Sequence, residues 1–116
     1  MTDWDEREPI YVQLAQTVLE NILRGSLPEG EPVPSVRQVA SQERINPLTV
    51  SRGYQILVDE GLLEKRRGLG MFVAAGAREL ALQQERDRFL AEEWPKTRSR
   101  IALLGLNVDQ LLAEET

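Results

Sequence analysis

The sequence predicts a mainly α-helical protein with one short β-hairpin. Apolar residues recur every three or four positions through most of the 116 residues, which is the period of helices with one buried face. Most prolines and glycines stand where one such segment gives way to the next. Residues 62–74, LLEKRRGLGMFVA, differ because two short apolar runs flank a glycine-bearing turn, which is typical of a hairpin.

The amino-acid composition excludes several classes of function. The chain has no Cys and no His, so it lacks disulfides, thiolate metal sites and the commonest acid–base catalyst. We therefore expect neither a metal nor a cofactor, and we do not expect an enzyme; a carboxylate site among Glu92, Glu93 and Asp109 is the remaining alternative. The acidic N-terminus does not fit a signal peptide, and no apolar run approaches membrane-spanning length, so a cytoplasmic protein is expected.

Charge is unevenly distributed along the chain. The net charge at pH 7 is −5, which by itself argues against nucleic acid as a partner. Residues 1–34 carry a net charge of −5 and residues 71–116 one of −2, whereas residues 35–70 carry +2. Residues 35–70 are therefore the segment whose charge suits binding to a polyanion.

Residues 9–24 predict the first helix. Pro9 suits a first helical turn, and Gly25 suits the residue that ends a helix. Apolar residues recur every four positions between them, at Ile10, Leu14, Val18 and Ile22. The next segment, SLPEGEPVP, holds three prolines and one glycine, so neither a helix nor a strand is expected to run through it.

A short second helix is predicted after this connection. Ser35 and Gln38 fit a capping box, in which the serine accepts a hydrogen bond from the first turn of the helix. The apolar positions are Val36, Val39 and Ala40. This helix is expected to end near Glu43 or Arg44.

The third helix is predicted to begin at Pro47, with Asn46 as its cap. Proline is favourable at a first helical position because its missing N–H would have no partner there. The helix should reach about Glu60, with Gly61 at its end and a buried stripe of Val50, Tyr54, Leu57 and Val58. Gly53 costs about 1 kcal/mol relative to alanine inside a helix, so we expect another helix to approach closely at this position.

The predicted hairpin consists of Leu62–Leu63, Met71–Val73 and the turn Gly68-Leu69-Gly70. The run Lys65-Arg66-Arg67 leads into the turn, and strand alternation places Arg66 on the opposite face from the other two. Such charges are also typical of a strand edge that avoids aggregation.

A charged helical tail follows. A helix is predicted over residues 77–93, and Trp94-Pro95 is expected to break or sharply bend it. A second helix should run from Pro95 to Leu104 and stop at Gly105. Asn107 fits the cap of a short last helix that contains Leu111 and Leu112.

Two helices joined by a three- or four-residue turn are typical of a helix-turn-helix, and a basic hairpin directly after them is a wing. The predicted fold is therefore a winged helix-turn-helix domain over residues 1–75, followed by a helical tail over residues 76–116. The exposed start of the third helix carries short hydrogen-bonding groups and an arginine. Such groups contact phosphates and base edges in the major groove of DNA.

The run LPEGEPVPSVRQVASQERINPLTVSRGYQILVDEGLLEKRRGLGMFV resembles the winged helix-turn-helix domain of the GntR family of bacterial transcription regulators. PIYVQLAQTVLENILRG resembles the opening helix of the same domain. The short tail and the Asn-Pro start of the third helix resemble the YtrA subfamily, whose short helical tail serves dimerisation. The resemblance implies a homodimeric repressor that binds an inverted-repeat operator, often in its own transporter operon.

The resemblance also implies which residues contact DNA and which form the dimer. The DNA-contacting residues would be Ser35, Arg37, Asn46, Pro47, Leu48, Thr49, Ser51, Arg52, Arg66, Arg67, Gly68, Leu69 and Gly70. The dimer residues would be Leu82, Phe89, Leu90, Trp94, Ile101, Leu104, Leu111 and Leu112. Leu48 and Leu69 depart from the family pattern, in which a polar residue and a basic or small residue are usual.

Two questions stay open on the sequence alone. A winged helix also serves as a protein-interaction module, which the acidic net charge favours and the clustered arginines disfavour. Regulation by a small-molecule effector bound between the winged domain and the tail is one hypothesis, and regulation without a ligand is the other.

Overall fold

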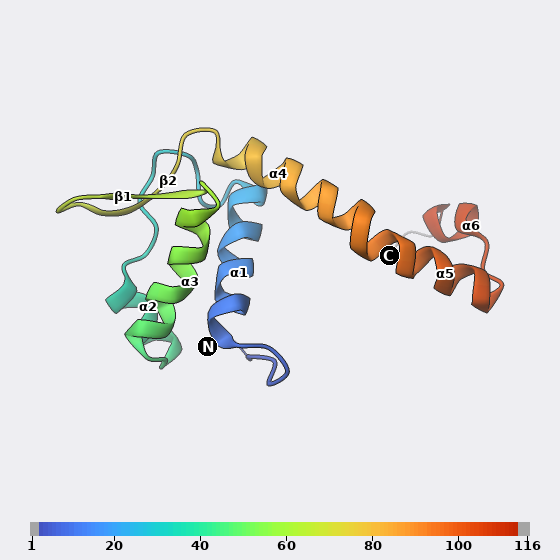
Figure 1. The fold of residues 1–116 in the computed structure, drawn as a ribbon, viewed down its shortest axis with the longest axis horizontal. Coiled ribbons are helices and arrows are strands. Elements are labelled where there is room, and N and C mark those ends of the chain that lie inside the picture. Colours follow the sequence, from blue (N-terminus) through green and yellow to red (C-terminus); the bar gives the residue numbers. More distant parts are fainter. Residues whose placement is uncertain (1–2, 114–116) are drawn as a thin grey trace. The chain divides into compact units, whose positions relative to one another are not determined.

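A computed structural model describes residues 3–113 of the chain (Figure 1). Its elements are α1 Ile10–Arg24, α2 Val36–Glu43, α3 Pro47–Asp59, β1 Leu63–Arg66, β2 Gly70–Val73, α4 Ala77–Arg88, a π-helical turn Phe89–Glu93, α5 Trp94–Leu104 and α6 Val108–Ala113. The predicted fold class, mainly helical with one antiparallel hairpin, is confirmed. The ends of the predicted domains, residues 1–2 and 114–116, lie outside the described residues.

The chain forms two compact units that meet between residues 82 and 83, inside α4. The sequence-based boundary was placed at 75/76. The first turns of α4 carry Ala77 and Ala81, which are fully buried in the core of the first unit. This burial explains why the first unit extends beyond the wing.

The core of the first unit forms where α1 packs along α3, and Figure 1 shows the two helices side by side. A side-chain Cβ added at Gly53 would lie 3.0 Å from the Tyr11 carbonyl oxygen and 3.2 Å from Leu14 Cδ2. The expectation that another helix approaches closely at Gly53 is therefore confirmed. The largest side chains that are almost completely buried in this core are Ile22, Val50, Tyr54, Leu57, Leu62 and Val73.

Local hydrogen bonds set the ends of α2 and α3. The Ser35 hydroxyl oxygen accepts a hydrogen bond from the Gln38 N–H at 3.0 Å, and the Asn46 side-chain oxygen accepts one from the Leu48 N–H at 2.9 Å. Arg44 ends α2 in the left-handed conformation, with φ of 56°. Both predicted caps are confirmed, and Arg44 supplies the turn between the two helices without a glycine.

The wing is a two-stranded antiparallel sheet in which Leu63 pairs with Val73 and Arg66 with Gly70. Leu62 was predicted to lie in the first strand, but it precedes β1 and donates its N–H to the Leu57 carbonyl oxygen at 2.8 Å. The connection after α1 contains no strand, as expected, yet it covers the outer edge of β2. Hydrogen bonds from Val33 N–H to Met71 O and from Val73 N–H to Glu31 O, both 2.9 Å, hold it there.

Trp94-Pro95 was predicted to break or sharply bend the tail helix, and the predicted break is wrong. Helical backbone continues from α4 into α5 through the π-helical turn. The Trp94 N–H donates to the Phe89 carbonyl oxygen, five residues back, in place of the usual partner four residues back. Proline lacks an N–H and crowds the preceding turn, so the wider π turn accommodates Pro95 without ending the helix.

Tyr54 links α3 to the start of α2. Its side chain is only 1% exposed, and its hydroxyl donates a hydrogen bond of 2.6 Å to the Pro34 carbonyl oxygen. Burial raises the pKa of Tyr54 to about 12. The bond holds the residue before Ser35 and so fixes where α2 begins.

We expect Tyr54 to reduce stability at alkaline pH. The pKa is about 12 when the protein is folded and about 10 when it is unfolded, so the unfolded chain loses this proton first. The contribution of Tyr54 is complete below pH 10 and is lost as the pH rises toward 12, by on the order of 1 kcal/mol at pH 11. Urea unfolding at neutral pH and at about pH 11 would measure it. Wild type should lose more stability than Tyr54→Phe, and equal losses would contradict the expectation.

Candidate nucleic-acid interface

The exposed surface of α3 carries the largest group of predicted DNA contacts. Val50, Gly53, Tyr54 and Leu57 face inward, which leaves Leu48, Ser51, Arg52 and Gln55 exposed on the opposite side of the helix. Asn46 and Pro47 are also exposed, and Thr49 is half-buried. Leu48 is 72% exposed, so the core gives no reason for an apolar side chain there. The exposed positions form one continuous face along the first three turns.

A groove lies between this face, the start of α2 and the wing. It has a volume of about 270 Å³, and its polar lining comes from Ser35, Ser51, Gln55 and Lys65. These side chains come from three different elements, which the Tyr54–Pro34 hydrogen bond and the β1–β2 pairing hold in place. Three neutral hydrogen-bonding groups and one ammonium suit an anionic ligand such as a DNA phosphate.

The two faces of the wing differ in chemistry. Arg66 lies with Glu64 and Phe72: its Nη2 is 2.8 Å from the Glu64 carboxylate, and its guanidinium carbon is 4.0 Å from the centre of the Phe72 ring. Lys65, on the other face, lines the groove with Met71. The predicted alternation of the basic run is thus present, and Arg66 is engaged within the wing. Its contact with DNA stays a prediction.

The tip of the wing is fully exposed. Gly68 and Gly70 have φ of 77° and 107°, a backbone conformation that other residues rarely adopt. Arg67 and Leu69 project from the same turn, and Leu69 is 72% exposed. The tip therefore exposes one cationic side chain, Arg67, and one apolar side chain, Leu69, to solvent.

Arg37 and Arg52 add positive charge on either side of α3. Arg37 is exposed on α2, two residues after Ser35. The guanidinium carbon of Arg52 is 4.0 Å from the centre of the Tyr11 ring on α1. All the predicted contact residues of α2, α3 and the wing thus belong to the first compact unit.

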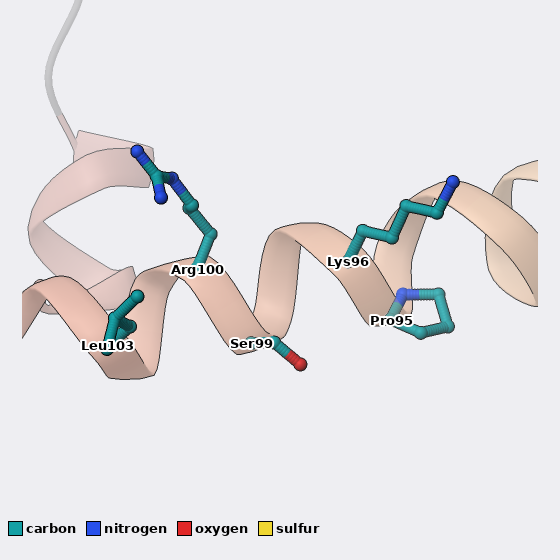
Figure 2. A pocket seen from close by; sticks show the side chains of 5 residues that line it. All are labelled: Pro95, Lys96, Ser99, Arg100 and Leu103. Carbon is teal, nitrogen blue, oxygen red and sulfur yellow. The ribbon is translucent and has the colours of Figure 1, made fainter.

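The second unit has a different character, because none of its described residues, 83–113, is buried. Of the predicted dimer residues, Trp94 and Ile101 are half-buried, and Phe89, Leu90, Leu104, Leu111 and Leu112 are exposed. Leu82, at the end of the first unit, is half-buried. Figure 2 shows a shallow hollow on α5, where Lys96 and Arg100 point to the same side of the helix near Leu103.

Sequence reasoning missed three residues of the candidate interface. Gln55 stands one turn beyond Ser51 and Arg52, so helical spacing alone would have placed it on the same face. Lys65 was separated from Arg66 by strand alternation but was not counted among the contacts. Tyr11 was not singled out, because no local pattern links it to Arg52.

Within residues 3–113, no group of three or more acidic side chains is arranged to hold a metal ion. Over the same range, no helix combines the length and apolarity needed to cross a membrane.

Comparison with known proteins identifies the family. The family described as "Bacterial regulatory proteins, gntR family" matches residues 10–73. The chain is 32% identical to the uncharacterized HTH-type transcriptional regulator YhcF of Bacillus subtilis, over 90% of this chain and 85% of YhcF. It is 40% identical to the HTH-type transcriptional repressor YtrA of the same species, over 60% of this chain and 54% of YtrA.

A solved structure agrees in fold over nearly the whole chain. A GntR family transcriptional regulator from Listeria monocytogenes superposes with a TM-score of 0.76, covering 95% of each chain at 24% identity. The helix-turn-helix, the basic wing and the family match over residues 10–73 coincide in one segment. The chain therefore belongs to the GntR family of bacterial transcription regulators, a family of transcription factors and not of enzymes.

Proposed function

We propose that this protein is a homodimeric repressor that binds an inverted-repeat DNA operator, in an operon that encodes a membrane transporter and the repressor itself. The observation that carries the DNA-binding part is the exposed face of α3 beside the groove that Lys65 lines. This face lies in residues 35–70, whose net charge is +2 in a chain of net charge −5. The local charge favours contact with phosphates, while the overall charge disfavours binding in other orientations.

The homodimer part of the proposal is supported by the apolar surface of the tail. Leu90 is 61% exposed and Leu104 is 54% exposed, and no described residue from 83 to 113 is buried. A helical segment gains little stability from propensity alone, so its apolar side chains need a partner surface. A second copy of the same tail supplies such a surface.

Charge complementarity supports pairing between two copies. Residues 83–93 carry four acidic and two basic side chains, whereas residues 94–104 carry three basic side chains and no acidic one. In an antiparallel arrangement of two tails, the acidic half of one copy lies along the basic half of the other. In a two-fold symmetric pair of this kind, the acidic half and the basic half of each copy both face side chains of opposite charge.

Two-fold symmetry determines the form of the operator. The α3 helices of the two copies enter the major groove on one side of the duplex, so the half-sites form an inverted repeat. Their centres should be about one helical turn, or a multiple of it, apart. A small-molecule effector would act by changing the spacing between the two α3 helices. If a thermal-shift screen of metabolites finds none that stabilises the protein, the effector is removed from the proposal.

The test of this function is the loss of DNA affinity in Arg37→Ala. Removal of one exposed phosphate- or base-contacting arginine should weaken binding by about 1–3 kcal/mol, or roughly five- to 150-fold. Fluorescence polarisation with a duplex selected from a random-sequence pool, at two salt concentrations, measures the effect. Arg24→Ala removes an exposed arginine of α1, outside the interface, and should leave affinity unchanged.

The competing function is a protein-interaction module with the same fold. If no duplex is enriched from the pool at any salt concentration, the DNA-binding proposal fails in favour of this module. If a duplex is enriched but Arg37→Ala binds it as tightly as wild type, the assignment of Arg37 to the interface is wrong. The observation that favours a protein-interaction module is the acidic net charge of the whole chain.

A further inference from the structure

The first turn of α1 lies against the exposed face of α3 next to its predicted DNA contacts. The guanidinium carbon of Arg52 is 4.0 Å from the centre of the Tyr11 ring. Tyr11 is half-buried, whereas Arg52 stays exposed. A guanidinium that lies over the face of a ring can still donate from its in-plane N–H groups to another partner, and the exposure of Arg52 leaves room for one.

Gly53 explains why Tyr11 reaches this position. The Tyr11 carbonyl oxygen lies 3.0 Å from the place that a Cβ of residue 53 would occupy, so α1 approaches α3 closely beside Arg52. The segment before α1 is tied down as well. The Gln13 side-chain amide donates to the carbonyl oxygens of Asp5 at 2.6 Å and Glu8 at 2.9 Å. The backbone at Tyr11 therefore lies close against α3, and Gln13 fixes the segment that precedes it.

We propose that Tyr11 is a positioning residue that holds Arg52 for contact with a DNA phosphate at the edge of the major groove. The proposal rests on the DNA-binding function given above. The contact with Tyr11 draws Arg52 toward the side of α3 that faces α1. An arginine loses side-chain freedom when it binds, and a side chain already stacked on a ring loses less of it.

The stacking geometry suits a phosphate in particular. Phosphate oxygens accept hydrogen bonds from two in-plane N–H groups at once, while the face of the guanidinium stays on the ring. Each phosphate contact contributes about 0.9 to the slope of log affinity against log salt concentration. This slope distinguishes a phosphate contact from a base contact or from a change in overall stability.

The experiment compares four variants on the selected duplex: Arg52→Ala, Tyr11→Phe, Tyr11→Leu and the double variant Tyr11→Leu/Arg52→Ala. Arg52→Ala should weaken binding roughly tenfold and lower the salt slope by about 1. Tyr11→Leu should weaken binding about fivefold and lower the slope in the same direction. Tyr11→Phe keeps the ring and should bind like wild type. The double variant should bind no more weakly than Arg52→Ala alone.

Several results would overturn the proposal while leaving the proposed function intact. In the first, wild type and Tyr11→Leu bind the duplex equally well. In the second, the losses of affinity in Tyr11→Leu and Arg52→Ala add in full in the double variant. An unchanged salt slope in Arg52→Ala would also overturn it. Thermal melting of each variant shows whether the fold persists, and Tyr11→Phe separates the ring from the packing of α1. If wild type binds no duplex, the proposed function itself fails.

Discussion

Replacing Gly53 with valine should lower the free energy of unfolding by about 2–3 kcal/mol. The new Cβ would lie 3.0 Å from a backbone oxygen of α1 and 3.2 Å from Leu14 Cδ2, and the two further methyl groups of valine need more room. Backbone cannot move aside as the end of a flexible side chain can, so α1 must shift away from α3. Urea unfolding followed by circular dichroism measures the loss.

Ser51→Val is the matched control for this prediction. It introduces the same β-branched residue into the same helix at an exposed position. Valine has a higher helix propensity than glycine, so propensity alone would make Gly53→Val slightly more stable. If Gly53→Val were as stable as wild type, the packing of α1 on α3 described here would be wrong.

The largest effect on DNA binding is expected from Leu90→Asp/Leu104→Asp, two charges placed on the apolar surface of the tail. Both leucines are exposed in the single chain, so the fold of each copy should persist. Formation of the proposed dimer would bury the new carboxylates at the interface, which is unfavourable. Analytical ultracentrifugation should show monomers. Affinity for the full inverted repeat should fall by about 100-fold, because linked half-site binding is lost. Affinity for a single half-site should not change.

The control Ala91→Asp/Ala102→Asp adds the same charge to neighbouring exposed positions on other sides of the helices. It should remain dimeric and bind the full operator normally. The proposed tail-mediated dimer would be refuted by two outcomes: a leucine variant that sediments as a dimer, or control and leucine variants that dissociate equally.

Features of the fold that depend on neighbouring residues could be predicted from the sequence. The caps of α2 and α3 follow from the side chains of Ser35 and Asn46, which reach only two or three residues ahead. The close approach at Gly53 followed from its cost inside a helix. The contact between Tyr11 and Arg52 joins helices far apart in the sequence, and no local rule places one beside the other.

Two other features were set by competition between local preferences. Proline usually ends a helix, but at Pro95 a wider turn removes the conflict, and the choice depends on the residues on both sides. In the wing, three adjacent basic residues look alike in the sequence. Glu64 and Phe72 hold Arg66 on one face, while Lys65 faces the groove on the other.

The π-helical turn Phe89–Glu93 also sets the rotational phase of the tail. One extra residue in a turn advances the positions that follow by about 100° around the helix axis. Phe89 and Trp94, five residues apart, are brought onto one line by that turn, and Ile101 follows seven residues later. In an uninterrupted α-helix, Trp94 and Ile101 would lie on a different side from Phe89. A one-residue irregularity thus keeps the apolar side chains before and after Pro95 in register.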